Sequence, residues 1–370
     1  MKTAYRSNLN LTAVARKIRQ SRQVAITTHA KPDGDAFGSV VALAAALRQL
    51  HIEVSAWFIP PVPATFRCLK GRDLVQSYNP SVGLPQVDLM VVVDTGAWSQ
   101  LAPMRDRLSP ALLERTLIID HHLAGDLPAA WRHVDPKSAA CCEIIFRLIG
   151  RLQGSGDSRV DLLTPVVCEA LFVGVASDTG WFRFSNTRAQ THGLAAKLIR
   201  RGVNQAQIYQ ELEQQARPEK LALQTRALGS LRLHADGRVA VMVLRAEDFI
   251  ETGALLEETE RFVDMPQSVV SVQVVVLITQ TPPHHKHTHR PVSPSTANST
   301  PPETRTVRLS FRSKPGPQAV DVAQLASRFG GGGHARAAGA KVKAPLGQVV
   351  QQVEQATVLA VGEQNESEIS

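Results

Sequence analysis

The segment Leu117-Ile118-Ile119-Asp120-His121-His122 decides how this chain of 370 residues folds. A short apolar run ends here in an aspartate and two adjacent histidines. Apolar runs of this length, bounded by polar residues, are typical of buried strands in a parallel sheet. Ligands of open α/β sheets bind outside the carboxyl ends of such strands. We therefore expect Asp120, His121 and His122 to lie at a strand tip and to face a crevice.

Three other apolar runs in the first half of the chain also end in acidic or imidazole side chains. These are residues 23–28, followed by His29, Asp33 and Asp35; residues 87–93, followed by Asp94; and residues 171–176, followed by Asp178. If the four ends meet at one sheet edge, their carboxylates repel one another unless protons or cations neutralise them. Oxygen and imidazole ligands without cysteine suit Mn²⁺ or Mg²⁺ better than structural Zn²⁺. The pattern therefore predicts a pair of divalent metal ions.

Alternation of strands and helices in this half predicts right-handed βαβ units and a parallel sheet. Pro32 and Gly34 would break a helix, so we expect Asp33 and Asp35 in a loop, with the next helix opening at Gly38. For residues 171–176 two interpretations remain open, a strand or the end of a buried helix.

The remainder of the chain predicts a second, smaller domain. We expect a first domain at residues 1–205, a helical linker at 206–228, a second domain at 229–362 and a tail at 363–370. Residues 281–304 are rich in Pro, Ser, Thr and His and are typical of a disordered insertion. Four consecutive glycines at 330–333 favour neither helix nor strand, and their N–H groups can converge on an anion.

Composition narrows the class of protein. The net charge of +8 and the pI near 9.6 favour a polyanionic partner such as nucleotide or RNA, although a solvated basic surface would also account for them. Four cysteines without a CxxC pair fit the reducing cytoplasm. The chain shows no apolar signal core and no run of about 18 apolar residues, so we expect neither a signal peptide nor a membrane span.

Five motifs together resemble a known family. They are HAKPDGDAFGS at 29–39, VVVDTG at 91–96, IIDHH at 118–122, VASDTGWFRFSNT at 175–187 and GGGGHARAAG at 330–339. In this order they resemble the DHH phosphoesterase superfamily with a C-terminal DHH-associated domain, and most of all its bacterial nanoRNases, which also dephosphorylate 3'-phosphoadenosine 5'-phosphate (pAp). The resemblance implies an α/β fold, with an N-terminal parallel-sheet DHH domain, a smaller α/β DHH-associated domain and an active site in the cleft between them.

The same resemblance implies a role for each motif residue. One metal would be held by His29, Asp33 and Asp94, and the other by Asp35, Asp94, His121 and Asp178, with Asp94 bridging. Asp120 would support its histidine neighbours, and His122 would contact the scissile phosphate. Substrate would be anchored by Gly332, Gly333, His334 and Arg336. The implied cofactors are two divalent ions, Mn²⁺ before Mg²⁺ or Co²⁺.

The implied substrates are short oligoribonucleotides and pAp, with no membrane partner. Within the enzyme class, a phosphodiesterase for cyclic or linear dinucleotides such as c-di-AMP or pApA remains an alternative. From another class, the chain could be a catalytically silent nucleotide-binding module, which loss of any metal ligand would favour. A homodimer is left open, because the sequence does not determine the oligomeric state.

Overall fold

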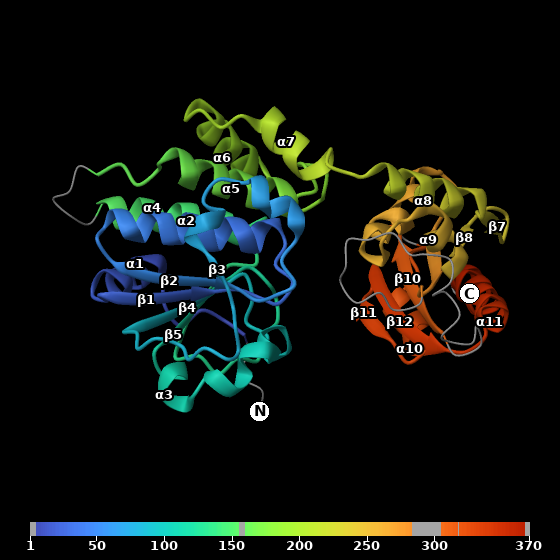
Figure 1. The fold of residues 1–370 in the computed structure, drawn as a ribbon, viewed down its shortest axis with the longest axis horizontal. Helices are drawn as coiled ribbons and strands as arrows, with labels where there is room; N and C mark the ends of the chain where they lie inside the picture. The colour runs from blue at the N-terminus through green and yellow to red at the C-terminus, as the bar shows by residue number, and fades with distance from the viewer. Residues whose placement is uncertain (1–4, 155–159, 283–304, 317, 367–370) are drawn as a thin grey trace. The chain divides into compact units, whose positions relative to one another are not determined.

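A parallel sheet forms the centre of the first of two units, Met1–Gln215 (Figure 1). The computed structural model describes residues 5–154, 160–282, 305–316 and 318–366. The six strands pair in the order β3-β2-β1-β4-β5-β6, and every pairing is parallel. Their bounds are β1 Gln23–Thr27, β2 Glu53–Phe58, β3 Gln76–Ser77, β4 Leu89–Val93, β5 Thr116–Asp120 and β6 Trp131–Val134. All five residues of β4 and of β5 are buried, as expected where both faces of a parallel sheet are covered.

Helices cover both faces of this sheet. The helices of this unit are α1 Leu11–Arg19, α2 Gly34–Gln49, α3 Pro110–Leu113, α4 Cys141–Gly154, α5 Pro165–Asp178, α6 Ala189–Arg200 and α7 Gln205–Glu213, with 3-10 segments Ala64–Cys68, Arg72–Leu74 and Trp98–Arg107. One core joins β1, β4 and β5 to α1, α2, α4, α5 and α6, and a second core lies on the opposite face under the 3-10 segment Trp98–Arg107. Figure 1 shows α2, α4 and α5 on one side of the sheet and α3 on the other. The expectation of an α/β fold with a parallel sheet is thus confirmed.

Two helix assignments differ from the expectations. Residues 171–176 belong to α5, so the helical interpretation holds and the strand is wrong; this helix is buried almost all round, which removes the periodicity that would have identified it. Helix α2 begins at Gly34 and not at Gly38, so Asp35 lies in its first turn and not in a loop. Asp33 is the N-cap, and its Oδ1 accepts hydrogen bonds from the N–H groups of Asp35 and Ala36, each 3.0 Å away.

Glycines let α2 and α5 approach each other closely. A Cβ on Gly38 would lie 2.3 Å from the Ala170 carbonyl oxygen, and one on Gly34 would lie 2.5 Å from Cβ of Ser177. On the facing helix, a Cβ on Gly174 would lie 2.8 Å from Oδ1 of Asp35. Small residues on both helices therefore bring the first turn of α2 beside the end of α5.

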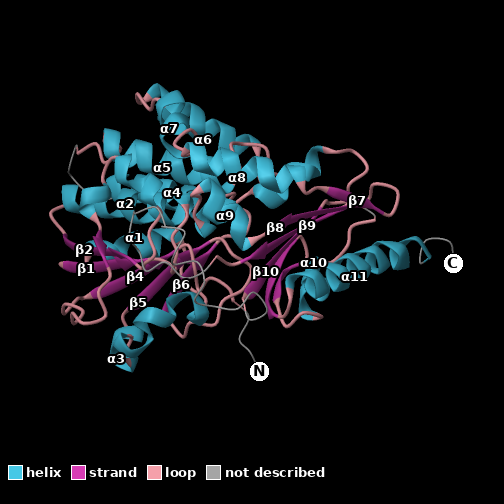
Figure 2. Cartoon of the chain, turned by 45° about the vertical axis from the view of Figure 1, so that its right-hand side comes forward, coloured by secondary structure: helices cyan, strands magenta, loops and turns pink. Residues whose placement is uncertain are grey.

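The second unit, Ala216–Ser370, contains a mixed sheet. Its strands pair in the order β11-β12-β10-β9-β8-β7, with β8 and β9 parallel and the other pairs antiparallel. Their bounds are β7 Arg232–His234, β8 Val239–Leu244, β9 Val274–Gln280, β10 Thr306–Ser313, β11 Gly332–His334 and β12 Ala337–Lys343. The helices are α8 Pro218–Gly229, α9 Ala246–Thr252, α10 Val322–Ser327 and α11 Leu346–Glu366, with 3-10 segments Leu256–Thr259 and Phe262–Ser268 (Figure 2).

This second sheet is also covered on two faces. Helices α10 and α11 pack on one face, over Val307, Leu309 and Phe311 of β10. Helices α8 and α9, with the segment Phe262–Ser268, pack on the other face, over β8 and β9. The expectation of a smaller α/β second domain is confirmed by this arrangement.

The boundary regions differ in detail from the expected ranges. Residues 206–228, expected as a helical linker with an interruption near Pro218, are divided between α7 of the first unit and α8 of the second, which begins at Pro218. Leu223 and Ala227 of α8 are buried in the second unit's core. Helix α11 extends to Glu366, four residues into the expected tail. The insertion expected at 281–304 lies, from residue 283 onward, outside the described residues. Within the described ranges, no helix combines the length and apolarity needed to cross a membrane.

Candidate metal centre

Asp120 organises the tip of β5. Its side chain is fully buried, and Oδ1 accepts hydrogen bonds from the N–H groups of His121 (2.8 Å) and His122 (3.2 Å). The same oxygen lies 2.7 Å from Nδ1 of His122, and Oδ2 accepts a 2.6 Å hydrogen bond from the Tyr5 hydroxyl. Burial alone would raise the pKa of Asp120, but His122 and Tyr5 lower it overall. Asp120 is therefore an anion that orients the two histidines.

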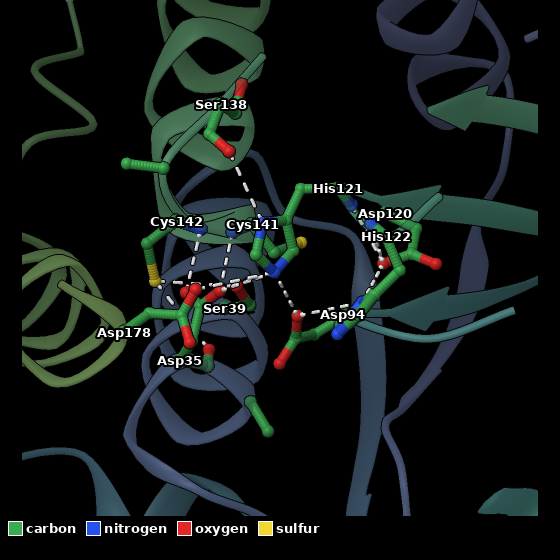
Figure 3. Close-up of polar contacts among 12 residues, drawn as sticks. Asp35, Ser39, Asp94, Asp120, His121, His122, Ser138, Cys141, Cys142 and Asp178 are labelled. Atoms are coloured by element: carbon green, nitrogen blue, oxygen red, sulfur yellow. Dashed lines mark hydrogen bonds and ion pairs between the residues drawn. The ribbon is translucent and has the colours of Figure 1, made fainter. Parts of the chain in front are cut away.

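His121 lies at the centre of three carboxylates (Figure 3). Its Nε2 is 3.3 Å from Oδ1 of Asp94, 3.5 Å from Oδ2 of Asp178 and 3.8 Å from Oδ2 of Asp35. Its Nδ1 lies 3.3 Å from the Ser138 carbonyl oxygen, which can only accept, so the neutral ring carries its proton on Nδ1. The Nε2 lone pair is then directed at the carboxylates, as a metal ligand requires.

His29 has the same arrangement on the other side of Asp94. Its Nε2 lies 3.5 Å from Oδ2 of Asp94 and 3.8 Å from Oδ1 of Asp33, and its Nδ1 lies 3.1 Å from the Ala30 carbonyl oxygen. One oxygen of Asp94 thus faces His29 and the other faces His121. Asp94 follows β4 with a left-handed φ of 60°, a conformation that is uncommon outside glycine. The carboxylate of Asp94 is thus held between the two imidazole rings.

Asp35 approaches the centre from the first turn of α2. The carboxylate accepts hydrogen bonds from the first two N–H groups of α4, from Cys141 at 2.5 Å and from Cys142 at 2.9 Å (Figure 3). Despite these donors, burial, together with the charges of Asp94 and Asp178, raises the pKa of Asp35 well above its usual value. The carboxyl groups are therefore packed too tightly to be charged together without a cation.

Asp178 ends α5 just before a strained turn. Gly180, Trp181 and Phe182 have φ values of 53°, 59° and 64°, and consecutive left-handed residues are costly, at roughly 1–2 kcal/mol each for residues other than glycine. The turn is held by a 3.0 Å hydrogen bond from Nε1 of Trp181 to Glu213 and by stacking of Phe182 on His192. Burial, with Asp94 and Asp33, raises the pKa of Asp178 to about 6 although His121 lowers it.

The donor set fits divalent cations. Three groups of side chains each bring their ligand atoms within 4.8 Å of one another: His29, Asp33 and Asp94; Asp35, His121 and Asp178; and Asp94, His121 and His122. Oδ1 of Asp94 is buried and, within the described part of the chain, accepts no hydrogen bond. A buried carboxylate oxygen without a donor, among neighbouring acids with raised pKa values, is explained by a cation that completes its coordination. All six expected ligands thus converge on two adjoining positions that could hold metal.

The glycine segment in the second unit differs from its expected form. Gly332 and Gly333 do not form an open loop but pair with Gly339 and Ala338 of β12, so that β11 is an edge strand. The N–H groups of Gly330 and Gly331 donate to the carbonyl groups of Ser327 and Ala326. The glycines are required for close approach, because a Cβ on Gly331 would lie 2.2 Å from the Gly339 carbonyl oxygen.

The side chains of the two expected substrate residues nevertheless remain accessible. His334 and Arg336 are exposed, and Nη1 of Arg336 makes only long hydrogen bonds, of 3.3 Å, to Ser313 Oγ and the Lys314 carbonyl oxygen. The imidazole of His334 and the guanidinium of Arg336 can therefore contact a ligand without breaking a strong internal hydrogen bond.

Several residues that support the centre were not identified from the sequence. Tyr5 is the first: its ring occupies a slot beside Gly96 and Gly125, where a Cβ would come within 1.9 Å and 2.4 Å of it. Burial and the Asp120 carboxylate raise the pKa of Tyr5, so its hydroxyl remains a donor. No periodicity or motif marks a single tyrosine in a polar segment.

The loop after Asp178 is held by further residues that the sequence did not identify. Asn186 donates through Nδ2 to the carbonyl oxygens of Ala139 (3.0 Å) and Asp178 (3.1 Å). Buried Glu143 accepts from Thr191 (2.5 Å) and Arg188 (3.1 Å). These contacts tie the end of α5 to the start of α4, and the only sequence signal was the SNT within the motif at 175–187, to which no role was assigned.

Comparison with known proteins identifies the class that this fold and site define. Residues 23–175 match the DHH family, N-terminal domain, and residues 236–360 match the DHHA1 domain. The chain therefore contains a DHH-family N-terminal domain followed by a DHHA1 domain, and the resemblance seen in the five motifs is confirmed.

Among curated relatives, the chain is similar to the bifunctional oligoribonuclease and PAP phosphatase NrnA of Thermus thermophilus, with 28% identity over 319 residues that cover 86% of this chain and 83% of the relative. It is 23% identical to the NrnA of Bacillus subtilis, over 90% of this chain and 93% of that protein. A solved structure, an exopolyphosphatase-related protein from Bacteroides fragilis, superposes with a TM-score of 0.79 at 20% identity and covers 96% of this chain and 97% of its own. That likeness concerns the fold.

Proposed function

We propose that this protein is a metal-dependent phosphoesterase that hydrolyses very short oligoribonucleotides and removes the 3'-phosphate of pAp. The observation that carries the proposal is the carboxylate of Asp94, with one oxygen toward His29 and the other toward His121. The similarity to curated relatives that are named oligoribonuclease and PAP phosphatase, along most of both chains, supports the choice of substrates.

The proposed cofactors are two divalent ions, with Mn²⁺ favoured over Mg²⁺ or Co²⁺. His29, Asp33 and Asp94 would hold one ion, and Asp35, Asp94, His121 and Asp178 the other. When bound, two such ions activate water and neutralise charge on the phosphate during in-line displacement. Imidazole together with carboxylate ligands suits Mn²⁺, whereas Mg²⁺ prefers an all-oxygen shell.

Side chains of the protein would then orient the substrate and donate a proton to it. His122 is about half exposed, and its Nδ1 is fixed by Asp120, so its Nε2 is left free to contact a phosphate oxygen. The Asp120 carboxylate raises the pKa of His122 against the opposing effect of burial, which favours a ring that donates a proton. Tyr5 holds the other oxygen of Asp120 and keeps this pair aligned. In the second unit, Gly332, Gly333, His334 and Arg336 would bind a part of the substrate that does not react.

Side-by-side turnover tests the proposal. With Mn²⁺, the protein should hydrolyse pAp and a 5'-labelled RNA dimer, and should act far more slowly on an RNA 24-mer and on c-di-AMP. Faster turnover of c-di-AMP than of either expected substrate would instead identify a cyclic-dinucleotide phosphodiesterase. Binding of nucleotide without turnover of any substrate, with both metals present, would identify a silent binding module. For an enzyme of this kind we propose a cytoplasmic location.

A further inference from the structure

One face of the second sheet is only half covered. Along β10, Val307, Leu309 and Phe311 point into the core under α10 and α11. The alternate residues of β10 and of its neighbour β12 share the opposite face. Among the described residues, α8, α9 and the segment Phe262–Ser268 pack on this face mainly over β8 and β9, and Asp264 of that segment reaches Arg312 of β10. On β10 and β12 the residues of this uncovered face are Thr306, Arg308, Ser310, Arg312, Ala337, Gly339, Lys341 and Lys343.

Two cations stand directly opposite each other on this face. Arg308 and Lys341 are register partners in the antiparallel pair of β10 and β12, and both are exposed. Like charges in this position destabilise a sheet. Within the described ranges neither side chain forms an ion pair, although the neighbouring Arg305 and Arg312 pair with Glu247 and Asp264. Among the described residues, Arg308, Lys341 and the neighbouring Lys343 are therefore the cations of this face without an ion pair, and Arg308 and Lys341 are the two that stand directly opposite each other.

The pair is aligned with the glycine segment. His334 is the register partner of Ala337, and Gly332 is the partner of Gly339, so both lie on the same face as Lys341. Lys341 is two residues beyond Gly339 along β12, a step of roughly 7 Å. On β10, β11 and β12, the cross-strand residues between His334 and Lys341 on this face are Gly332, Gly339 and Ser310. Two are glycines and the third has a small side chain, so none of them projects far from the sheet.

We propose that Arg308 and Lys341 form a phosphodiester-binding pair for the chain of a short oligoribonucleotide, two such steps along the sheet, or roughly 14 Å, from the row of His334. The proposal rests on the proposed function, because it assigns part of that substrate. An anion between the two side chains would remove the repulsion that the empty sheet face carries. The pair would act on RNA with an internal phosphodiester beyond the first, whereas pAp has no phosphate to occupy it.

The test compares wild type with the double variant Arg308→Ala/Lys341→Ala. We expect kcat/KM on an RNA pentamer to fall about tenfold or more, and kcat/KM on pAp to stay within about twofold. Loss of one phosphate contact should also reduce the slope of log affinity for the pentamer against log salt by about 0.7. The conservative variant Arg308→Lys/Lys341→Arg should restore most of the affinity.

The control is Lys220→Ala/Arg226→Ala on α8, which removes the same formal charge from a half-buried and an exposed position elsewhere in this unit. An equal loss of pentamer binding in the control would show a general field effect and overturn the proposal, as would an unchanged pentamer affinity in the Arg308/Lys341 variant. Pentamer binding, measured by fluorescence anisotropy on the metal-free full chain, keeps the two proposals distinguishable. If wild type hydrolyses no substrate, the proposed function fails, while the binding comparison still decides on the pair.

Melting temperature gives a second readout. Because the two cations repel, either single alanine variant should melt at the same temperature as wild type or higher. If Arg308 and Lys341 form a binding site, their loss should raise stability and weaken RNA binding. Loss of a structural contact would instead lower stability.

Discussion

At the scale of a single residue, Asp94 has two energetically unfavourable features. Its left-handed backbone would be unfavourable in an ordinary loop, and so would its buried Oδ1, which among the described residues has the imidazole of His121 beside it and no hydrogen bond of good geometry. Both are explained if the carboxylate is needed at one point between His29 and His121. The strain is therefore an indication of function that comes from an observed backbone outlier.

We predict that Asp94→Ala abolishes turnover, because it removes the ligand common to both proposed metal sites. Metal analysis of the purified variant should show loss of at least one of two equivalents. His122→Ala is the matched comparison: it should retain both metals and lose rate, since the Nδ1 of that ring is held by Asp120 and the residue is assigned to the phosphate. Retention of both metals by Asp94→Ala, with activity within about tenfold of wild type, would contradict the bridging role.

Metal binding should release protons. In the metal-free protein burial favours neutral rings, but Asp33 and Asp94 raise the pKa of His29 to about 10, and Asp94, Asp35 and Asp178 do the same for His121. Both histidines are thus protonated at neutral pH and must lose a proton to bind metal. Metal affinity should rise with pH between about 7 and 9. Calorimetry in two buffers of different ionisation heat should find at least two protons released at pH 8, one from each histidine, with a further contribution from Asp35, whose pKa is also raised. Release of no protons would show that both rings are already neutral.

The stability of the metal-free fold depends on pH in the opposite direction to metal affinity. A histidine whose folded pKa is raised stabilises the metal-free fold fully below its unfolded value of 6.5 and loses that contribution as pH rises through about 10. High pH therefore favours the metal-bound protein over the metal-free one on both counts.

At the scale of elements, the contact between α2 and α5 determines the geometry of the centre. Both helices are buried on almost every side, and three glycines set their separation. Asp35 and Asp178 can face His121 together only at this short distance.

We predict that Gly38→Ala destabilises the first unit by roughly 1–3 kcal/mol, because its Cβ would lie 2.3 Å from a backbone carbonyl oxygen that cannot move freely. It should also weaken metal retention. Gly193→Ala in α6 is the control: no atom lies within 4 Å of its Cβ position, so it should be neutral or stabilise by about 0.5–1 kcal/mol. Denaturant unfolding of the metal-free proteins measures both. Equal stability of the two variants would show that the helices can separate without cost.

Elements also explain how far the sequence could predict this site. The buried strands β4 and β5 are apolar runs, and the ligands that follow them were identified because strand ends in a parallel sheet meet at one edge. Helix α5 could not be separated from a strand, because burial all round removes the helical period. The start of α2 was misplaced because Gly34 was interpreted as a helix breaker, whereas its role is close contact with Ser177. Tyr5 could not be found, because its partner is 115 residues away.

At the scale of the whole molecule, the two units have different chemistry. The ligand set lies entirely in the first unit, and the exposed His334 and Arg336 lie in the second. Variants in the first should change the rate of the chemical step, and variants in the second should change binding.

Arg336→Ala should therefore raise KM for pAp with little change in kcat. A contact between charged groups contributes roughly 1.5–3 kcal/mol, so KM should rise about tenfold to a hundredfold. Arg226→Ala, which removes an exposed cation of the same unit on α8, is the control and should leave KM unchanged. Steady-state kinetics on pAp decide the matter. An unchanged KM with kcat lowered about a thousandfold would assign Arg336 to the reacting phosphate.

The hydrogen bond between Tyr5 and Asp120 sets an order for the assembly of the protein during synthesis. Ser7 likewise bonds to Val134, 127 residues later, so residues 5–7 cannot make these contacts until β5 and β6 have been synthesised. The last ligand, Asp178, follows only when α5 is complete. Since chains emerge from the amino end, the strands nearest the start can pair while the centre is still unfinished. A ribosome stalled before residue 178 would thus present a partly folded sheet that has every ligand of the first proposed metal site and an incomplete set for the second.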